Sequence, residues 1–380
     1  MICSLPIWST NLVDIKIRIY FPGLTLYEGE KKVLKIIVKR RKDGRILTLS
    51  FAFLFIILWI LIGFNLKNPD YEYYENLFLR ATQGISYHAV ETGFWYIVEF
   101  AAKIGLSYSL FLKIYTLIAL LLISSSIIKY TEKPSLVLVL YMCYPFLLDV
   151  AQIRHFMAIA IFTFSVRYLE SYSKKNLIKY IFLIVIAASQ QIMAIAFLAY
   201  LLVYLIDQKK AAKIAIMLTI INMFGCKYIL QSSLVKKIFS LRDKTVDYTG
   251  GYSNSQLLMY ACFYGILIIL CVFLQKTNNV DKTNSSFLYK ICMYSTLFIP
   301  FLMIDFQYTR LFRGSILVIY IFITQQINLL KKSDKLIVTI GLLLIMILVA
   351  IKLFGKGSGY FETLTMPIFQ NNEVLYFLFK

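Results

Sequence analysis

Residues 336–354 read LIVTIGLLLIMILVAIKLF, and Lys352 carries the only charge in this stretch. An α-helix needs about 20 mainly apolar residues to cross the hydrocarbon core of a bilayer. Lys331, Lys332 and Lys335 stand immediately before the run. Clustered lysines next to an apolar run mark the cytoplasmic side of a span. The stretch therefore predicts a transmembrane helix that begins at the cytoplasmic face.

Comparable runs fill most of the chain, which has 380 residues, of which 59% are hydrophobic and 16% are charged. So much apolar surface exceeds what one soluble core can hide. We expect further spans at 46–64, 108–128, 135–150, 153–170, 177–189, 191–206, 212–230, 255–275, 287–304 and 311–330. The chain is thus predicted to be an all-α, polytopic integral membrane helix bundle with about ten or eleven transmembrane helices. The pair 177–189 and 191–206 is short, and predicts either a tight hairpin or broken helices.

The basic residues predict the sidedness of the bundle. The formal charge is +20, but its lysines and arginines cluster between apolar runs as in cytoplasmic loops, which argues against nucleic-acid binding. Residues 1–45 form a basic tail that we expect in the cytoplasm, beneath an inner (cytoplasmic) membrane. Alternation from that side assigns 46–354 to the membrane domain and places 65–107, 231–254 and the tail 355–380 outside the cell membrane. The same alternation leaves five lysine clusters inside: Lys129/Lys133, Lys174/Lys175/Lys179, Lys209/Lys210/Lys213, Lys276/Lys282 and Lys331/Lys332/Lys335.

The outer segment 65–107 is too long to be a connector alone. Asn68-Pro69-Asp70 is typical of a helix start, and predicts a short surface helix from Tyr71 to Thr82. A second surface helix is expected to begin near Glu91. Its membrane-facing side chains are expected to be Phe94, Trp95, Val98 and Ala102.

Arginines concentrate near the outer ends of the predicted spans, whereas the inner loops use mainly lysine. Arg154, Arg310 and Arg313 are these outer arginines, and the last two share one helix face. A guanidinium presents a planar fork of donors that suits phosphate, so three of them together would clamp a diphosphate. The alternative is that they form ion pairs with Asp149 or Asp305, or extend to the interface.

Several other residues of the outer layer could take part in sugar chemistry. Asp70 and Glu91 are candidates to orient or deprotonate a sugar hydroxyl, because their loop has room for a substrate. Tyr71 and Tyr74 could stack on sugars, or belong to the aromatic belt at the membrane interface. His155, beside Arg154, could act as a base near neutral pH or as a packing residue.

The sequence excludes several classes of site. Its 6 cysteines occur singly and its 2 histidines are His88 and His155, so we expect no metal site and no cofactor. Nothing matches a phosphate-binding loop, a dinucleotide fingerprint or a zinc-protease helix, which excludes ATP hydrolysis by this chain.

Four short motifs resemble those of a known family. Residues 68–74 resemble its Asp-x-x-x-Tyr loop, and Glu91-Thr92-Gly93-Phe94 resembles its Glu-x-Gly-Phe/Tyr element. Residues 153–160 are similar to its Leu-Arg-Gln-x-Leu-Ala pattern, and residues 308–313 resemble its late arginine-bearing helix start. Over about 47–330, the chain is similar to the EpsG-like family of polysaccharide polymerases, relatives of the Wzy O-antigen polymerases. The chain departs from the family at Lys67, where arginine is usual, and at Gln190-Gln191, where histidine and a small residue are frequent.

The resemblance implies a reaction on the extracytoplasmic face. A growing glycan would pass from a polyprenyl diphosphate carrier to a carrier-linked repeat unit of an O-antigen, capsule or exopolysaccharide, without a metal. The resemblance implies that the diphosphate is held by Arg154, Arg310, Arg313 and His155. It implies that catalysis involves Asp70, Glu91 and Arg154, and that the glycan contacts Tyr71, Tyr74 and Gln191. Membrane lipid, a chain-length regulator and a flippase are the expected partners besides the lipid-linked oligosaccharide.

Three other functions remain open at this point. A lipid-linked oligosaccharide flippase or polysaccharide transporter would also use a basic cavity, but its internal repeats and spread of basic residues are not seen. An acyltransferase would need His88 or His155 as its histidine. A glycan ligase would be expected to carry a histidine late in the chain, and none follows His155.

Overall fold

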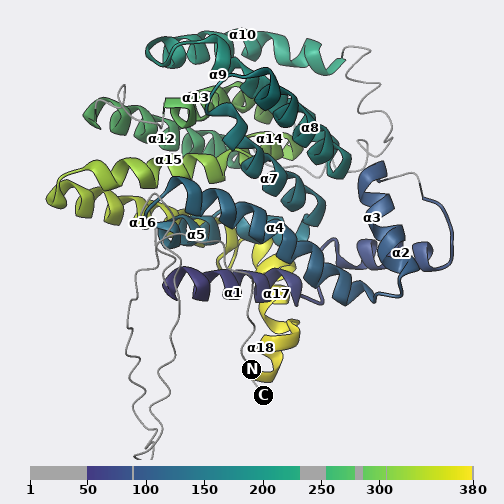
Figure 1. Ribbon diagram of the computed structural model, residues 1–380. Coiled ribbons are helices and arrows are strands. Elements are labelled where there is room, and N and C mark those ends of the chain that lie inside the picture. Colours follow the sequence, from purple (N-terminus) through teal and green to yellow (C-terminus); the bar gives the residue numbers. More distant parts are fainter. Residues whose placement is uncertain (1–48, 88–89, 232–253, 279–285, 305, 379–380) are drawn as a thin grey trace, which may run out of the picture.

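The computed structural model describes residues 49–87, 90–231, 254–278, 286–304 and 306–378, and its regular elements are helices throughout these ranges (Figure 1). In the same residues the only β-type pairing is an isolated antiparallel bridge between Asn65 and Asn372. The predicted all-α membrane bundle is confirmed. The basic tail 1–45, most of the loop 231–254, His88 and Asp305 lie outside the described residues.

Within the described ranges, four helices are long and apolar enough to cross a bilayer by themselves. They are α4 (Tyr108–Tyr130), the stretch Leu257–Asn278 of α12 (Asn254–Asn278), the stretch Thr309–Leu329 formed by α14 (Thr309–Arg313) and α15 (Ile316–Leu329), and α16 (Lys332–Phe354). Shorter apolar segments lie between them: α1 (Leu49–Gly63), α5 (Pro134–Cys143), η2 (Ile192–Leu201) with α9 (Leu202–Leu205), and α13 (Ser286–Tyr294) with η4 (Ser295–Met303). The remaining elements of the bundle are α6 (Phe146–Ala151), α7 (Ile153–Ser165), η1 (Val166–Leu169), α8 (Lys174–Gln190), α10 (Gln208–Gln231) and η5 (Phe306–Tyr308). The predicted number of crossings stays a prediction.

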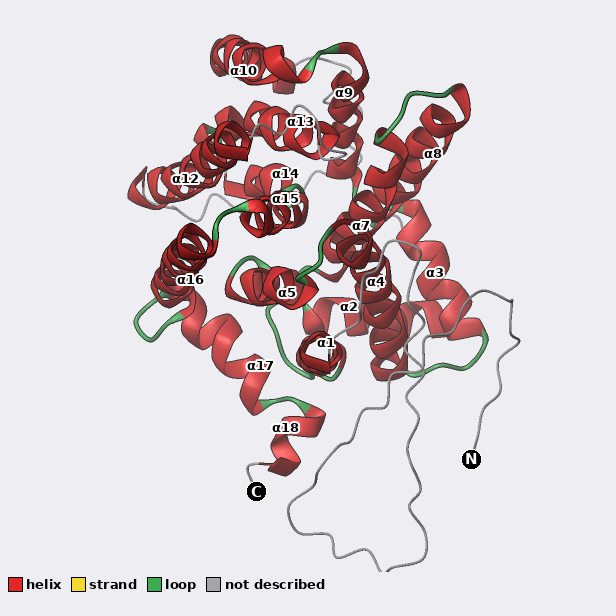
Figure 2. Cartoon of the chain, turned by 60° about the vertical axis from the view of Figure 1, so that its left-hand side comes forward, coloured by secondary structure: helices red, strands yellow, loops and turns green. Residues whose placement is uncertain are grey.

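The bundle has a central and a peripheral layer. The most apolar window of the α14–α15 span is 89% buried, whereas that of α16 is 17% buried. Figure 2 shows α16 at the edge of the bundle and α15 inside it. Leu336, Ile337 and Leu348 of α16 are exposed, as lipid-facing side chains are. The position of α16 therefore explains why its sequence is apolar on nearly every side.

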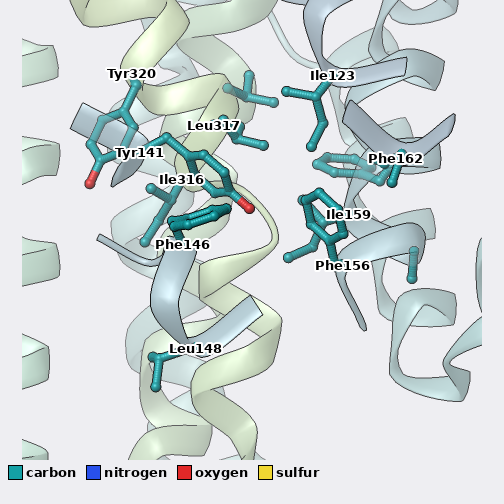
Figure 3. Packing of buried hydrophobic residues seen from close by; sticks show 14 of the residues in the cluster. Ile123, Tyr141, Phe146, Leu148, Phe156, Ile159, Phe162, Ile316, Leu317 and Tyr320 are labelled. Atoms are coloured by element: carbon teal, nitrogen blue, oxygen red, sulfur yellow. The ribbon is translucent and has the colours of Figure 1, made fainter. Parts of the chain in front are cut away.

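The core that carries the outer-end residues lies between α4, α5, α7 and α15. Figure 3 shows Phe156, Ile159 and Phe162 of α7 next to Ile123 of α4. On the other side of the same cluster lie Tyr141, Phe146, Ile316, Leu317 and Tyr320. The ring centroids of Phe162 and Phe197 are 4.3 Å apart. Close packing of this kind is the main source of helix association in lipid, and it fixes where the outer end of α7 lies.

The short pair of apolar runs forms a tight hairpin. Helix α8 ends at Gln190, Gln191 is extended with φ −149°, and η2 begins at Ile192. The two helices pack side by side, and the hydroxyl of Tyr180 donates to the carbonyl of Phe197 at 2.7 Å. The turn of this hairpin thus brings a stretch of non-helical backbone to the end of the bundle where α7 begins.

The predicted surface helices are present as α2 (Tyr71–Thr82) and α3 (Thr92–Lys103), with Glu91 directly before α3. The predicted membrane face of α3 is wrong. Phe94, Trp95 and Val98 are buried inside the protein, and Ala102 is half-buried. The ring of Phe94 contacts Tyr74 and Tyr115 at 5.8 Å. The apolar stripe that faces outward consists of Tyr96, Ile97, Phe100 and Ile104.

The chain ends in a π-helical turn η6 (Phe361–Thr365), α17 (Met366–Gln370) and α18 (Glu373–Leu378). Between α17 and α18 the backbone pairs with residues 64–66, just after α1. Figure 1 shows α17 beside α1. The C-terminal segment and the start of the outer loop therefore lie at one end of the bundle.

Candidate functional site

Arg154 lies in the first turn of α7 and is held by two residues of the segment 65–107. Its guanidinium forms an ion pair with the carboxylate of Glu91, and its Nε donates to the hydroxyl of Tyr74 at 3.1 Å. The side chains of Arg154 and Glu91 are 13% and 7% exposed. The guanidinium also lies 5.6 Å from the ring centroid of Tyr74 and 5.7 Å from that of Phe94, within cation–π range. The charge of Arg154 is thus already neutralised by the protein.

Glu91 joins three segments that are far apart in the sequence. One carboxylate oxygen pairs with Arg154, and the other accepts the backbone N–H of Ile192 at 3.2 Å. This contact requires the start of α3 to approach the end of α8 closely. A Cβ at Gly93 would lie 2.2 Å from Oγ of Ser189, so only glycine fits there. Glu91 and Gly93 therefore act together in fixing α3 to α7 and to the turn of the α8–η2 hairpin.

Arg313 lies deeper than Arg154 and is also paired. Its guanidinium is 3.1 Å from Oδ1 of Asp149, and the two side chains are 1% and 0% exposed. It also donates to Oε1 of Gln152 at 2.5 Å, while Tyr141 donates to Oδ2 of Asp149 at 2.8 Å. The ion pair that the sequence left open as an alternative is the observed arrangement for Arg313.

Arg310 differs from the other two arginines. It lies one turn before Arg313 on α14 and is half-buried. Within the described ranges, its side chain has no hydrogen bond and no ion pair. Its charge interacts over a longer range with those of Asp70, Arg154 and Arg313. Arg310 is therefore a guanidinium whose donors are available to a ligand.

Asp70 is the carboxylate that remains open in the same cluster. It occupies the position before α2, but its side chain does not cap the helix. In the part of the chain that the structure describes, its carboxylate has no hydrogen bond and no ion pair. Burial raises the pKa of Asp70 above its ordinary value, although the charges of Arg310 and Arg154 act to lower it. A carboxylate with a raised pKa, next to an open guanidinium, suits a group that accepts a proton beside a bound anion.

The other residues expected at the site are buried. Tyr71 is 8% exposed and lies edge-on to Tyr108 at 5.1 Å, and Tyr74 is 4% exposed. Gln191 is 5% exposed in the turn of the hairpin. His155 is 3% exposed, and its Nε2 has no hydrogen-bond partner among the described residues. The two tyrosine rings pack within the protein and therefore do not present free faces to a sugar.

Two glutamines of the cluster were not predicted from the sequence. Gln152 binds Arg313, and Gln190 accepts a hydrogen bond from the hydroxyl of Tyr115 at 3.0 Å. Both are polar residues at the edge of apolar runs, and that position is the signal that could have indicated them. In the described ranges, no group of three or more His, Cys, Asp or Glu side chains is arranged to hold a metal ion.

Comparison with known proteins gives one match. The model of the EpsG family matches residues 48–367, which is most of the chain. Nothing matches among the curated proteins or among the solved structures.

Proposed function

The chain belongs to the EpsG family, and from this premise we propose that it is a membrane polymerase of polysaccharide biosynthesis. It transfers a growing glycan from a polyprenyl diphosphate carrier to a carrier-linked repeat unit. The reaction takes place at the extracytoplasmic face of the inner membrane, with the N-terminus in the cytoplasm. The product is an O-antigen, a capsule or an exopolysaccharide.

The observation that carries the proposal is that, within the described ranges, two of the three arginines have a carboxylate partner and the third does not. Glu91 neutralises Arg154, and Asp149 neutralises Arg313. Arg310 keeps its charge and its donors, and among the described residues Asp70 is an unpaired carboxylate whose charge interacts with it. A diphosphate that binds Arg310 would supply the missing partner, because guanidinium and phosphate form paired, charge-assisted hydrogen bonds.

The bond changes can be assigned to these two groups. The hydroxyl oxygen of the acceptor sugar attacks the anomeric carbon of the donor, and the bond from that carbon to the diphosphate oxygen breaks. The hydroxyl proton passes to the carboxylate of Asp70, and polyprenyl diphosphate leaves with its charge stabilised by Arg310. The raised pKa of Asp70 favours proton acceptance.

The other outer residues are assigned to holding this arrangement. Both oxygens of Glu91 are occupied, one by Arg154 and one by the N–H of Ile192, so Asp70 is the better base. Arg154, whose charge Glu91 neutralises, fixes the outer loop to α7. Arg313 and its partner Asp149 lie behind Arg310 and hold α14 against α6.

The test uses the full-length protein, purified in lipid, with a polyprenyl-diphosphate-linked repeat unit, and scores laddered product on a gel. Arg310→Gln is expected to abolish laddering, because it removes the open positive charge. Arg80→Gln is the matched control: Arg80 is exposed on α2 of the same outer loop, and its guanidinium lies over the ring of Tyr87 at 5.3 Å. Full laddering by Arg310→Gln would overturn the assignment. A wild-type protein that flips the carrier without laddering would favour a transporter.

A further inference from the structure

The C-terminal segment is bound to the start of the outer loop by backbone and side-chain contacts. The carbonyl of Asn371 accepts the N–H of Leu66, and the N–H of Glu373 donates to the carbonyl of Phe64, both at 2.9 Å. The side-chain amide of Asn372 donates to the carbonyl of Ile60 at 2.8 Å. We call residues 371–373 the C-terminal clasp. It lies beyond residue 367, where the match to the family ends.

Glu373 attaches the clasp to a second element, the outer end of α4. Its carboxylate accepts a hydrogen bond from Ser109 at 2.7 Å and forms an ion pair with Lys113. The ammonium group of Lys113 also lies 4.6 Å from the ring centroid of Phe64. Burial raises the pKa of Glu373, but the hydrogen bonds from Lys113 and Ser109 outweigh it, so the pKa lies below its ordinary value. The carboxylate of Glu373 is therefore ionised at neutral pH, as its ion pair with Lys113 requires.

Backbone pairing followed by two side-chain hydrogen bonds connects the clasp to Asp70. Asn65, which pairs with Asn372 across the bridge, accepts a hydrogen bond from the side-chain amide of Asn68 at 3.0 Å. The side-chain oxygen of Asn68 in turn accepts the N–H of Asp70 at 3.0 Å. Asn65 and Asn372 are both 0% exposed, whereas the bonds of Asn68 to Asn65 and to Asp70 are part-buried.

We propose that the C-terminal clasp is a positioning element, which sets the place of the Asp70 carboxylate relative to Arg310. The proposal rests on the role of Asp70 in the proposed function. Since the carboxylate of Asp70 has no bond of its own within the described residues, its place depends on its backbone. That backbone is held through Asn68 and Asn65 by the clasp. A displacement of about 1 Å at a reacting group can lower a rate about 100-fold, so such an element affects turnover.

Two substitutions of Asn372 separate the clasp from the stability of α18. The side-chain oxygen of Asn372 caps α18 by accepting the N–H groups of Val374 and Leu375. Asn372→Ser keeps a cap but loses the bond to Ile60, whereas Asn372→Ala loses both. We expect both variants to lower kcat about 10-fold or more and to leave KM within about twofold, because substrate binding by Arg310 is intact. Phe377→Ala is the control, since this side chain is 79% exposed on the same helix.

Three further measurements test the coupling between the clasp and Asp70. In the Asn372 variants the acid limb of the pH–rate profile should move to lower pH, because a displaced Asp70 regains water. Hydrogen exchange at the amides of residues 66–71 should accelerate in both variants, a result that does not depend on activity. The double variant Asp70→Asn/Asn372→Ser should have the same activity as Asp70→Asn alone.

The outcomes keep the two proposals apart. If wild-type protein ladders, Asp70→Asn does not, and Asn372→Ser keeps the wild-type kcat and acid limb, the positioning role is wrong while the proposed function stands. If Asn372→Ala alone is impaired, the segment only stabilises α18, and the positioning role is again wrong. If wild-type protein does not ladder, the proposed function fails. In that case, unchanged hydrogen exchange at the amide of Asp70 in the Asn372 variants would still contradict the positioning role of the clasp.

Discussion

Arg154 and Glu91 form an ion pair across 63 positions of sequence, and the pair is almost closed to solvent. This contact fixes α3 to the first turn of α7, and the second oxygen of Glu91 extends it to Ile192. The segment 65–107 is therefore attached to the membrane bundle in the same cluster as Asp70 and Arg310, whose charges interact without an ion pair among the described residues.

Glu91→Ala is expected to destabilise the protein and to abolish activity. Breaking a buried ion pair by removing one partner costs about 3–5 kcal/mol, because the remaining charge stays buried and unpaired. Thermal unfolding in lipid nanodiscs would measure the loss. Glu99→Ala is the control on the same helix, since its partner Lys103 is 69% exposed and such pairs contribute at most about 1 kcal/mol. Equal shifts of Tm for the two variants would contradict the assignment.

Arg313→Met is expected to unfold the protein more readily than Arg310→Gln. It leaves Asp149 without its ion-pair partner at 0% exposure, whereas Arg310 has no partner among the described residues to abandon. The double variant Arg313→Met/Asp149→Leu should recover most of the loss, since an apolar pair often replaces a buried ion pair without cost. Thermal unfolding of the two single variants and the double variant tests this. If the double variant recovers nothing, the pair is not isolated from the rest of the cluster.

The pH dependence should report the raised pKa of Asp70. Because the ionised carboxylate accepts the proton, kcat/KM should fall as pH decreases through a pKa above the ordinary aspartate value. Asp70→Asn should have little activity and lack this limb. An acid limb at the ordinary aspartate value in the wild type would contradict the role of burial.

The stability that Asp70 contributes should change with pH in the direction opposite to activity. Its folded-state pKa lies above its unfolded value, so the stability that it contributes is fully present below the unfolded pKa and is lost as pH rises through the folded pKa. Asp70→Asn should therefore raise Tm at neutral pH while it lowers activity. Tm measured at neutral and at acidic pH, in the wild type and the variant, would show whether the difference disappears on acidification.

Gly93→Ala should lower both stability and activity. Its Cβ would lie 2.2 Å from Oγ and 2.6 Å from Cβ of Ser189, so α3 or α8 must move, at a cost of about 1–3 kcal/mol. Ser189→Gly in the same chain should restore part of the loss. Gly225→Ala is the control, because nothing lies within 4 Å of the added Cβ. Tm and laddering are the measurements, and a neutral Gly93→Ala would show that the two helices can separate without effect.

A reporter test would decide the sidedness. The positive-inside pattern predicts that a reporter fused after Lys210, in the first turn of α10, is cytoplasmic. A reporter inserted at Gly105, between α3 and α4, should be external. Alkaline phosphatase and green fluorescent protein fusions distinguish the two sides. The reverse result would move the proposed site to the cytoplasmic face.

The sequence by itself determined that this protein is an all-α membrane protein, and it located the start of α2. Runs such as 336–354 are too apolar for any solvent but lipid, and Pro69 with its neighbours marks the start of α2 at Tyr71, where the structure has it. The outer arginines were recognisable because a charged group near the end of an apolar run is costly and therefore uncommon. These are local properties, and they depend on spacing and on partition between water and lipid.

Only the tertiary structure decided which arginine is open. All three were equivalent in the sequence, and it took the packing of α3, α6, α7 and α14 to pair Arg154 with Glu91 and Arg313 with Asp149. The buried face of α3 was wrongly predicted for the same reason, since both of its faces carry aromatic side chains. The contact of Asn372 with Ile60 spans 312 positions, and no local pattern indicates it. Pairing is decided by which helix ends meet, and that depends on the close packing of the whole bundle.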